Sequence, residues 1–141
     1  MTAPIDDAAL ARQEAIFAQV FAAGDVRGAR SLYDPGVVYV SPTLRLFDRK
    51  APIEGLDATL EFIQLTLTGC ERIRYEAVER ACLDRGAGAF TRILFDFDFQ
   101  GERRRSDYVV LYHYREGRIT HQQLYYDPSG AFDRVAPPEA P

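Results

Sequence analysis

The stretch RILFDFDF at residues 92–99 decides the fold class of this chain. Apolar and polar side chains alternate along it, and one apolar row contains Ile93, Phe95, Phe97 and Phe99. Successive side chains of a β-strand point to opposite faces of its sheet, so this period of two predicts a strand. One face of the strand is expected against an apolar interior, with Asp96 and Asp98 pointing outward.

Three turn signals divide the chain around this strand. They are DRG at residues 84–86, QGE at 100–102 and EG at 116–117, and they separate four apolar-rich runs between residues 72 and 127. Four such runs joined by short turns predict an antiparallel meander. In the run 106–115, one row holds Tyr108, Val110, Tyr112 and Tyr114, and the other holds Asp107, Val109, Leu111 and His113. We expect the tyrosine row to face outward and Leu111 and His113 to face inward.

Helical periodicity dominates the first part of the chain. It predicts one helix over residues 6–23 that is stopped by Gly24, a short second helix over 26–33 that ends at the breaker DPG, and a third from 56 to about 68. Between the last two, residues 37–41 read as a strand and 42–52 as a loop. The order predicts an α+β fold, in which three N-terminal helices pack on a curved, mainly antiparallel sheet and form a cone with an internal pocket.

Composition sets the size class and the expected partners. The 141 residues, 47% of them hydrophobic, predict a single domain over 1–141, with a folded core at 8–130 and flexible ends at 1–6 and 134–141. A net charge of −4 argues against nucleic acid as a partner. No window approaches the roughly 20 apolar residues needed to cross a bilayer, so we expect a cytoplasmic protein without a membrane partner.

Cofactor chemistry is not indicated by the pattern of thiols and imidazoles. Cys70 and Cys82 lack the paired spacing of a redox or zinc motif, which favours inert thiols. His113 and His121 have no acidic partner at ligand spacing. We therefore expect neither a metal site nor a cofactor.

Four further motifs occur in a characteristic order. They are AGD at 23–25, LYDPGVVY at 32–39, GLDA at 55–58 and REGRITHQQLYYD at 115–127. Together they make residues 8 to about 130 resemble the SnoaL-like branch of the nuclear transport factor 2-like superfamily. This resemblance implies a cone-shaped fold with an apolar pocket, and a membership that ranges from isomerases and polyketide cyclases to non-catalytic binding domains.

Two catalytic patterns of the superfamily are incomplete here. The ketosteroid isomerases that this chain resembles have a tyrosine, an aspartate base and a second acid in their active site. At the matching positions this chain has Phe17, Ser41 and Leu111. None of these can take the corresponding role in proton transfer. The limonene epoxide hydrolases of the same superfamily have an Asp-Arg-Asp set. At the matching positions this chain has Arg92, but both acids are replaced, by Leu94 and Leu124.

The SnoaL-like cyclases and hydroxylases provide a pattern that this chain retains. Their histidine and aspartate on the last two strands match His113 and Asp127, which are our candidate catalytic residues. Asp127 also precedes Pro128 and is well suited to begin a turn, so a purely structural role for Asp127 remains an alternative. The expected ligand-binding residues are Phe17, Tyr39, Ser41, Phe95, Leu111, Gln122 and Tyr126.

Two classes of function remain open. The first is a cofactor-independent acid–base isomerase, cyclase or hydrolase that acts on a small apolar, carbonyl-bearing or polycyclic molecule. The second is a non-catalytic ligand-binding, dimerisation or accessory domain. Both are compatible with a homodimer in which the tyrosine row of residues 106–115 covers its counterpart.

Overall fold

The molecule consists of a single curved sheet with helices packed on one side of it. The computed structural model describes residues 4–126 and 133–134. The strands have the order β2-β1-β6-β5-β4-β3, and β7 pairs with β5. The elements are α1 (Asp7–Ala23), η1 (Val26–Leu32), β1 (Tyr33–Val40), α2 (Thr43–Leu46), β2 (Ile53–Glu54), α3 (Leu56–Thr66), β3 (Glu71–Leu83), η2 (Asp84–Gly86), β4 (Gly88–Phe99), β5 (Glu102–Arg115), β6 (Arg118–Tyr125) and β7 (Asp133–Arg134). The predicted α+β class and cone are confirmed.

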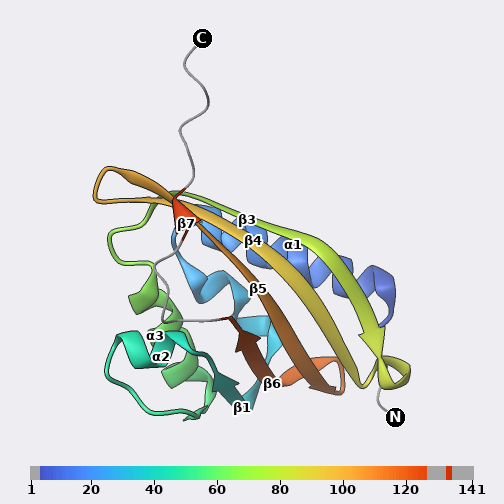
Figure 1. Cartoon of the computed structure of the whole chain (residues 1–141). Helices are drawn as coiled ribbons and strands as arrows, with labels where there is room; N and C mark the ends of the chain where they lie inside the picture. The colour runs from blue at the N-terminus through green and yellow to red at the C-terminus, as the bar shows by residue number, and fades with distance from the viewer. Residues whose placement is uncertain (1–3, 127–132, 135–141) are drawn as a thin grey trace.

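The two ends of the sheet carry different helices. Figure 1 shows α1 lying along the long strand β3, while α2 and α3 gather beside β1. All neighbouring strands pair antiparallel except β1 and β6, which are parallel. The core fills the space between the helices and the inner face of the sheet, and its largest fully buried side chains include Tyr33, Phe62 and Tyr112.

Helix α1 begins and ends where the sequence predicts. The Asp6 carboxylate accepts a hydrogen bond from the Ala9 backbone N–H at 2.7 Å, a cap that typically contributes about 1 kcal/mol. Gly24 ends the helix in the left-handed conformation, with φ of 71°. The helix buries one face, made of Leu10, Gln13, Glu14, Phe17 and Val20.

The segment after α1 differs in detail from the prediction. The second helix is a 3₁₀ helix, and residues 34–36 lie within β1 instead of ending a helix. Asp34 accepts a hydrogen bond from the Gly36 N–H at 2.9 Å, and the pairing of β1 with β6 is irregular between Tyr33 and Val38. The DPG sequence thus interrupts the regular pairing of a strand and does not end a helix. The expected loop at 42–52 contains the short helix α2.

The inward face of β5 is the opposite of the one expected. Phe97, on the inner row of β4, pairs with Arg104, and Phe95 pairs with Ser106. Directly opposed residues share a face of the sheet, so the row containing Val110 and Tyr112 also points inward. Val110 is 2% exposed and Tyr112 is fully buried, whereas Leu111 and His113 lie on the outer face.

The start of α1 is tied to the turn between β3 and β4. Ile5 is buried, and its backbone N–H donates to the Gly86 carbonyl at 3.0 Å. Ile5 belongs to the end at residues 1–6 for which flexibility is predicted, and in the structure it packs against this turn. The expected flexible end at 134–141 lies outside the described residues apart from Arg134, whose backbone pairs with Arg104.

Candidate functional site

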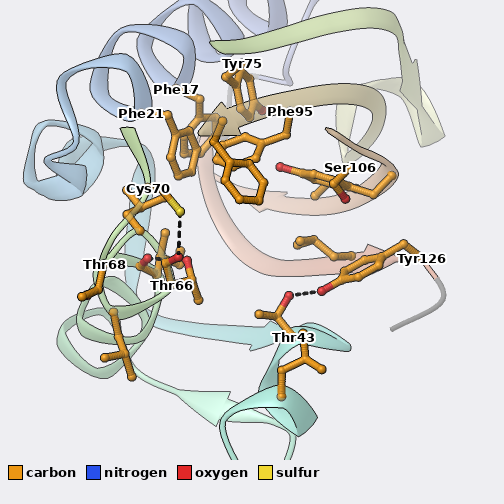
Figure 2. Close-up of a pocket in the computed structure, with 18 of the residues that line it drawn as sticks. Phe17, Phe21, Thr43, Thr66, Thr68, Cys70, Tyr75, Phe95, Ser106 and Tyr126 are labelled. Carbon is orange, nitrogen blue, oxygen red and sulfur yellow. Dashed lines mark hydrogen bonds between the residues drawn. The ribbon is translucent and has the colours of Figure 1, made fainter. Parts of the chain in front are cut away.

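A cavity of about 550 Å³ lies between the helices and the inner face of the sheet. Aromatic rings from α1, β3 and β4 form one wall, as Figure 2 shows for Phe17, Phe21, Tyr75 and Phe95. Leu46 and Phe47 also line the cavity and are 52% and 37% exposed, so the cavity opens to the surface beside these two residues. The volume is in the range of small-molecule sites.

Ring packing holds the aromatic wall together. The rings of Phe21 and Tyr75 stack with their centroids 5.1 Å apart, and Phe95 meets Phe21 edge-on at 5.6 Å. Phe17 contacts Phe21, Tyr33, Tyr75 and Tyr112. Such pairs favour fixed relative orientations of the rings, so this wall is a preformed apolar surface.

The side of the cavity across from this wall carries hydroxyl groups. Figure 2 shows the Tyr126 hydroxyl hydrogen-bonded to that of Thr43. Ser41 does not line the cavity. It accepts a hydrogen bond from the Thr43 backbone N–H at 3.1 Å, and its hydroxyl donates to that of Thr43 at 3.0 Å. Ser41 therefore holds the Thr43 hydroxyl, which lines the cavity, in position.

Gln122 brings an amide into the cavity from β6. The Tyr33 hydroxyl donates to Gln122 Oε1 at 2.6 Å, and this bond fixes the orientation of the amide. Tyr39 and Tyr108 also line the cavity, and burial raises the pKa of both phenols above the usual value. The tyrosines remain protonated near neutral pH and can donate hydrogen bonds.

Charge in the cavity is sparse and positive. Among the described lining residues there is no aspartate, glutamate or histidine, and the charged one is Arg104. Its Nη2 contacts Glu102 at 3.0 Å, while its Nε is buried without a hydrogen-bond partner among the described residues. One cation thus lies on a cavity surface that is otherwise uncharged among the described residues.

Glu14 is a buried acid directly behind the aromatic wall. Its carboxyl group accepts hydrogen bonds from the Tyr75 hydroxyl at 2.6 Å and from the Gln13 amide at 2.9 Å, and the Tyr112 hydroxyl lies at 3.4 Å. Burial raises the pKa of Glu14, although its hydrogen bonds oppose that rise. Tyr75 belongs to both the cavity wall and this cluster.

The structure places most, though not all, of the predicted ligand-binding residues at the cavity. Those that line it are Phe17, Tyr39, Phe95, Gln122 and Tyr126. Leu111 and the candidate catalytic residue His113 do not, because they lie on the outer face, where the ring of His113 packs against His121. Asp127 lies outside the described residues. Arg92 also faces outward, where it pairs with Asp107 at 2.7 Å and with Glu79 at 3.0 Å.

Sequence reasoning missed four polar groups at or behind the cavity. Arg104, Ser106 and Tyr108 follow from the pairing of β5 with β4 across a two-residue turn. Glu14 lies four residues after Leu10 and three before Phe17, so it falls on the apolar stripe of α1. A polar residue within such a stripe is the signal that could have identified it.

The described residues contain no group of three or more histidine, cysteine, aspartate or glutamate side chains placed to hold a metal ion. Likewise, none of the helices in the described ranges is long and apolar enough to cross a membrane.

The family of the chain follows from its match to a known domain. A family model described as a SnoaL-like domain matches residues 14–122. The chain belongs to the SnoaL-like family. No curated protein matches the sequence of this SnoaL-like chain.

Solved structures share the SnoaL-like fold at low sequence identity. A putative isomerase from Bacillus subtilis has a TM-score of 0.73 and 18% identity, with 86% of this chain and 88% of that chain covered. An LEH-like epoxide hydrolase from M. tuberculosis has a TM-score of 0.65 and 15% identity, with coverage of 85% and 84%. TerC, co-crystallised with polyporic acid, has a TM-score of 0.69 and 18% identity, with coverage of 84% and 92%.

Proposed function

We propose that this chain binds a small, largely apolar molecule with rings, carbonyl-bearing or polycyclic, in the cavity between α1, α3 and the sheet. The observation that carries the proposal is the cavity itself, about 550 Å³ in volume, walled by stacked aromatic side chains and supplied with few polar groups. Sites for small molecules typically combine an apolar lining with a few placed donors and acceptors. Here those groups are Gln122, Tyr126 and Arg104.

The solved relatives support this class of ligand. TerC was crystallised with polyporic acid, and the other two relatives are described as a putative isomerase and an LEH-like epoxide hydrolase. Because their identities to this chain are 15–18%, they support the kind of cavity rather than a particular ligand.

Two leucines on opposite faces of the sheet provide a direct test. Leu124 lines the cavity, whereas Leu111 faces outward on the neighbouring strand. Binding of anthraquinone and of a steroid ketone would be measured by calorimetry. We expect Leu124→Trp to weaken the binding at least tenfold because the indole fills the cavity, and Leu111→Trp to leave it unchanged. If neither compound binds the wild type, or if Leu124→Trp binds as the wild type does, the proposal is wrong.

Acid–base catalysis is a second candidate function. The observation that favours it is the hydrogen bond between Tyr75, in the cavity wall, and the buried carboxyl group of Glu14. A phenol next to a carboxyl group of raised pKa can exchange a proton with a bound ligand. The family resemblance adds Asp127 as a second proton-transfer group.

Turnover of any compound that binds separates the two functions. If the chain is an enzyme, Tyr75→Phe and Asp127→Asn each lower turnover by tenfold or more, within the usual range for a proton-transfer group. His113→Ala is the control, because His113 is exposed on the outer face. Binding without turnover in the wild type would leave binding as the function.

We further propose that two copies pair through the outer face of the sheet. The expected tyrosine contact is replaced there by a different set, since β5 and its neighbours present Val40, Phe90, Val109, Leu111 and Tyr125 on that face. Tyr125 is 49% exposed. This apolar patch, which Gln123 and Arg92 interrupt, favours a protein partner over solvent.

A further inference from the structure

A row of polar side chains runs along the inner face of β5. Arg104, Ser106 and Tyr108 occupy alternate positions of the strand, and all three line the cavity. At about 3.3 Å per residue, the row spans roughly 13 Å. Its neighbours on β4 are apolar, since Phe97 pairs with Arg104 and Phe95 with Ser106.

Each group in this row has a donor to offer to a ligand. The Nε–H of Arg104 is buried without an acceptor among the described residues. No described residue forms a hydrogen bond with the Ser106 or Tyr108 hydroxyl. A buried donor without an acceptor is destabilising, so a ligand oxygen atom at Arg104 Nε would be favourable, and the two hydroxyls could donate to further oxygen atoms.

The charge of Arg104 selects among possible oxygen atoms. Its Nη2 contacts Glu102 at 3.0 Å, and the Glu102 side chain is 39% exposed. A partly exposed carboxylate compensates only in part a guanidinium that is itself 23% exposed, and it leaves the buried Nε–H without an acceptor. Among the described lining residues no other charge is present, so a negatively charged oxygen is preferred at Arg104 over a neutral one.

We propose that the cavity is selective for acidic aromatic molecules, in which a flat ring system lies along Phe95 and Phe97 and an ionised oxygen is bound by Arg104. Carboxylates and acidic enols or phenols are the chemical classes that fit. Ser106 and Tyr108 donate to further oxygen atoms along the same edge of the ring system. This inference rests on the proposed function, because it names the class of ligand that the cavity binds.

A matched pair of probes tests the selectivity. Anthraquinone-2-carboxylate and its uncharged carboxamide have the same rings and differ in charge. Calorimetry at pH 7.5 should give at least tenfold tighter binding of the carboxylate to the wild type. Arg104→Met should lose this preference while its affinity for the carboxamide stays within about threefold of the wild-type value.

Arg105 provides the control variant. It follows Arg104 on the same strand but points outward, where it pairs with Asp96 at 2.7 Å. Arg105→Met should retain the preference for the carboxylate. Arg104→Lys retains the charge and should keep part of the preference, which separates the loss of charge from a change in folding.

The outcomes distinguish this inference from the function beneath it. Equal binding of the two probes to the wild type, or a preference that persists in Arg104→Met, overturns the selectivity and leaves the proposed cavity function standing. Failure of both probes overturns the selectivity, and if anthraquinone and the steroid ketone fail as well, the proposed function is overturned with it. Binding of the carboxylate that is lost equally in Arg104→Met and Arg105→Met also overturns the assignment to Arg104.

Discussion

Glu14 is the residue whose surroundings differ most from what its chemistry prefers. A carboxyl group usually lies in water or beside a cation, but this one is 5% exposed, and it accepts hydrogen bonds from tyrosine and glutamine side chains. Desolvation destabilises the ionised form more than these neutral donors stabilise it, which is why the pKa is raised. The folded protein therefore holds its Glu14 proton to a higher pH than the unfolded chain does.

The stability of the protein should depend on pH through this group. Because the folded pKa of Glu14 lies above the usual value of 4.5, its favourable contribution is present below that pH. The contribution is lost as pH rises through the folded pKa. We expect the free energy of unfolding of the wild type, relative to Glu14→Gln, to fall as pH is raised from 4.5, measured by urea denaturation at a series of pH values.

A second variant checks the cause of this effect. The hydrogen bond from Tyr75 lowers the pKa of Glu14, so Tyr75→Phe should raise that pKa further and extend the fall in stability to higher pH. A wild-type curve parallel to that of Glu14→Gln over the whole range would show that Glu14 titrates alike in both states.

Among the secondary structure elements, the β3–β4 turn carries the tightest packing constraint. Gly86 has φ of 90°, and a Cβ atom there would lie 2.5 Å from Pro4 Cβ and 2.6 Å from the Ile5 carbonyl oxygen. Gly101, in the β4–β5 turn, has φ of 80°, but a Cβ atom there would meet nothing within 4 Å beyond its chain neighbours. The two turns thus share a backbone conformation and differ in their surroundings.

Alanine at these two glycines separates backbone strain from crowding. Gly101→Ala should cost about 1–2 kcal/mol, the penalty for an L-residue in the left-handed region. Gly86→Ala should cost a further ~1–3 kcal/mol, because the methyl group displaces the chain before α1. Chemical denaturation measures both, and equal losses would mean that Pro4 and Ile5 are not held against the turn.

The β4–β5 hairpin shows how far sequence reasoning reaches. The alternation in residues 92–99 correctly predicted the inner face of β4, on which Ile93 and Phe97 are buried. Both rows of β5 contain apolar residues, so its own pattern was ambiguous. The turn at residues 100–101 resolves it, because a two-residue loop sets Phe99 opposite Glu102 and fixes every pair beyond.

The choice between the two rows of β5 also explains why the prediction that His113 enters the cavity is wrong. His113 lies between Tyr112 and Tyr114, which point inward, so a match by position along the strand placed it on the wrong face. The large apolar positions of the cavity, such as Phe17 and Phe95, were predictable because any inward residue of that size must border the interior. The inward position of Arg104 depends on strand pairing and could not be predicted from the pattern of its own strand.

At the scale of the whole molecule, the helices of the described residues lie on one side of the sheet, so its outer face has no covering layer of helices (Figure 1). We expect light scattering to give a mass near twice 15.9 kDa at micromolar concentration. Leu111→Asp should shift the mass to that of one chain, since it places a charge in the apolar patch. Leu46→Asp, at a site 52% exposed beside the cavity, should leave the mass unchanged. A wild-type mass of about 15.9 kDa would contradict the dimer.

The parallel pairing of β1 with β6 has a consequence for the growing chain on the ribosome. Tyr33 and its acceptor Gln122 are separated by 89 residues, so the buried hydroxyl has no partner until most of the sequence has been translated. Until then the edge of β1 that β6 will occupy is open, and unpaired edges of this kind invite pairing with other chains. The sheet therefore cannot close, and the cavity cannot form, before residues 118–125 have been translated.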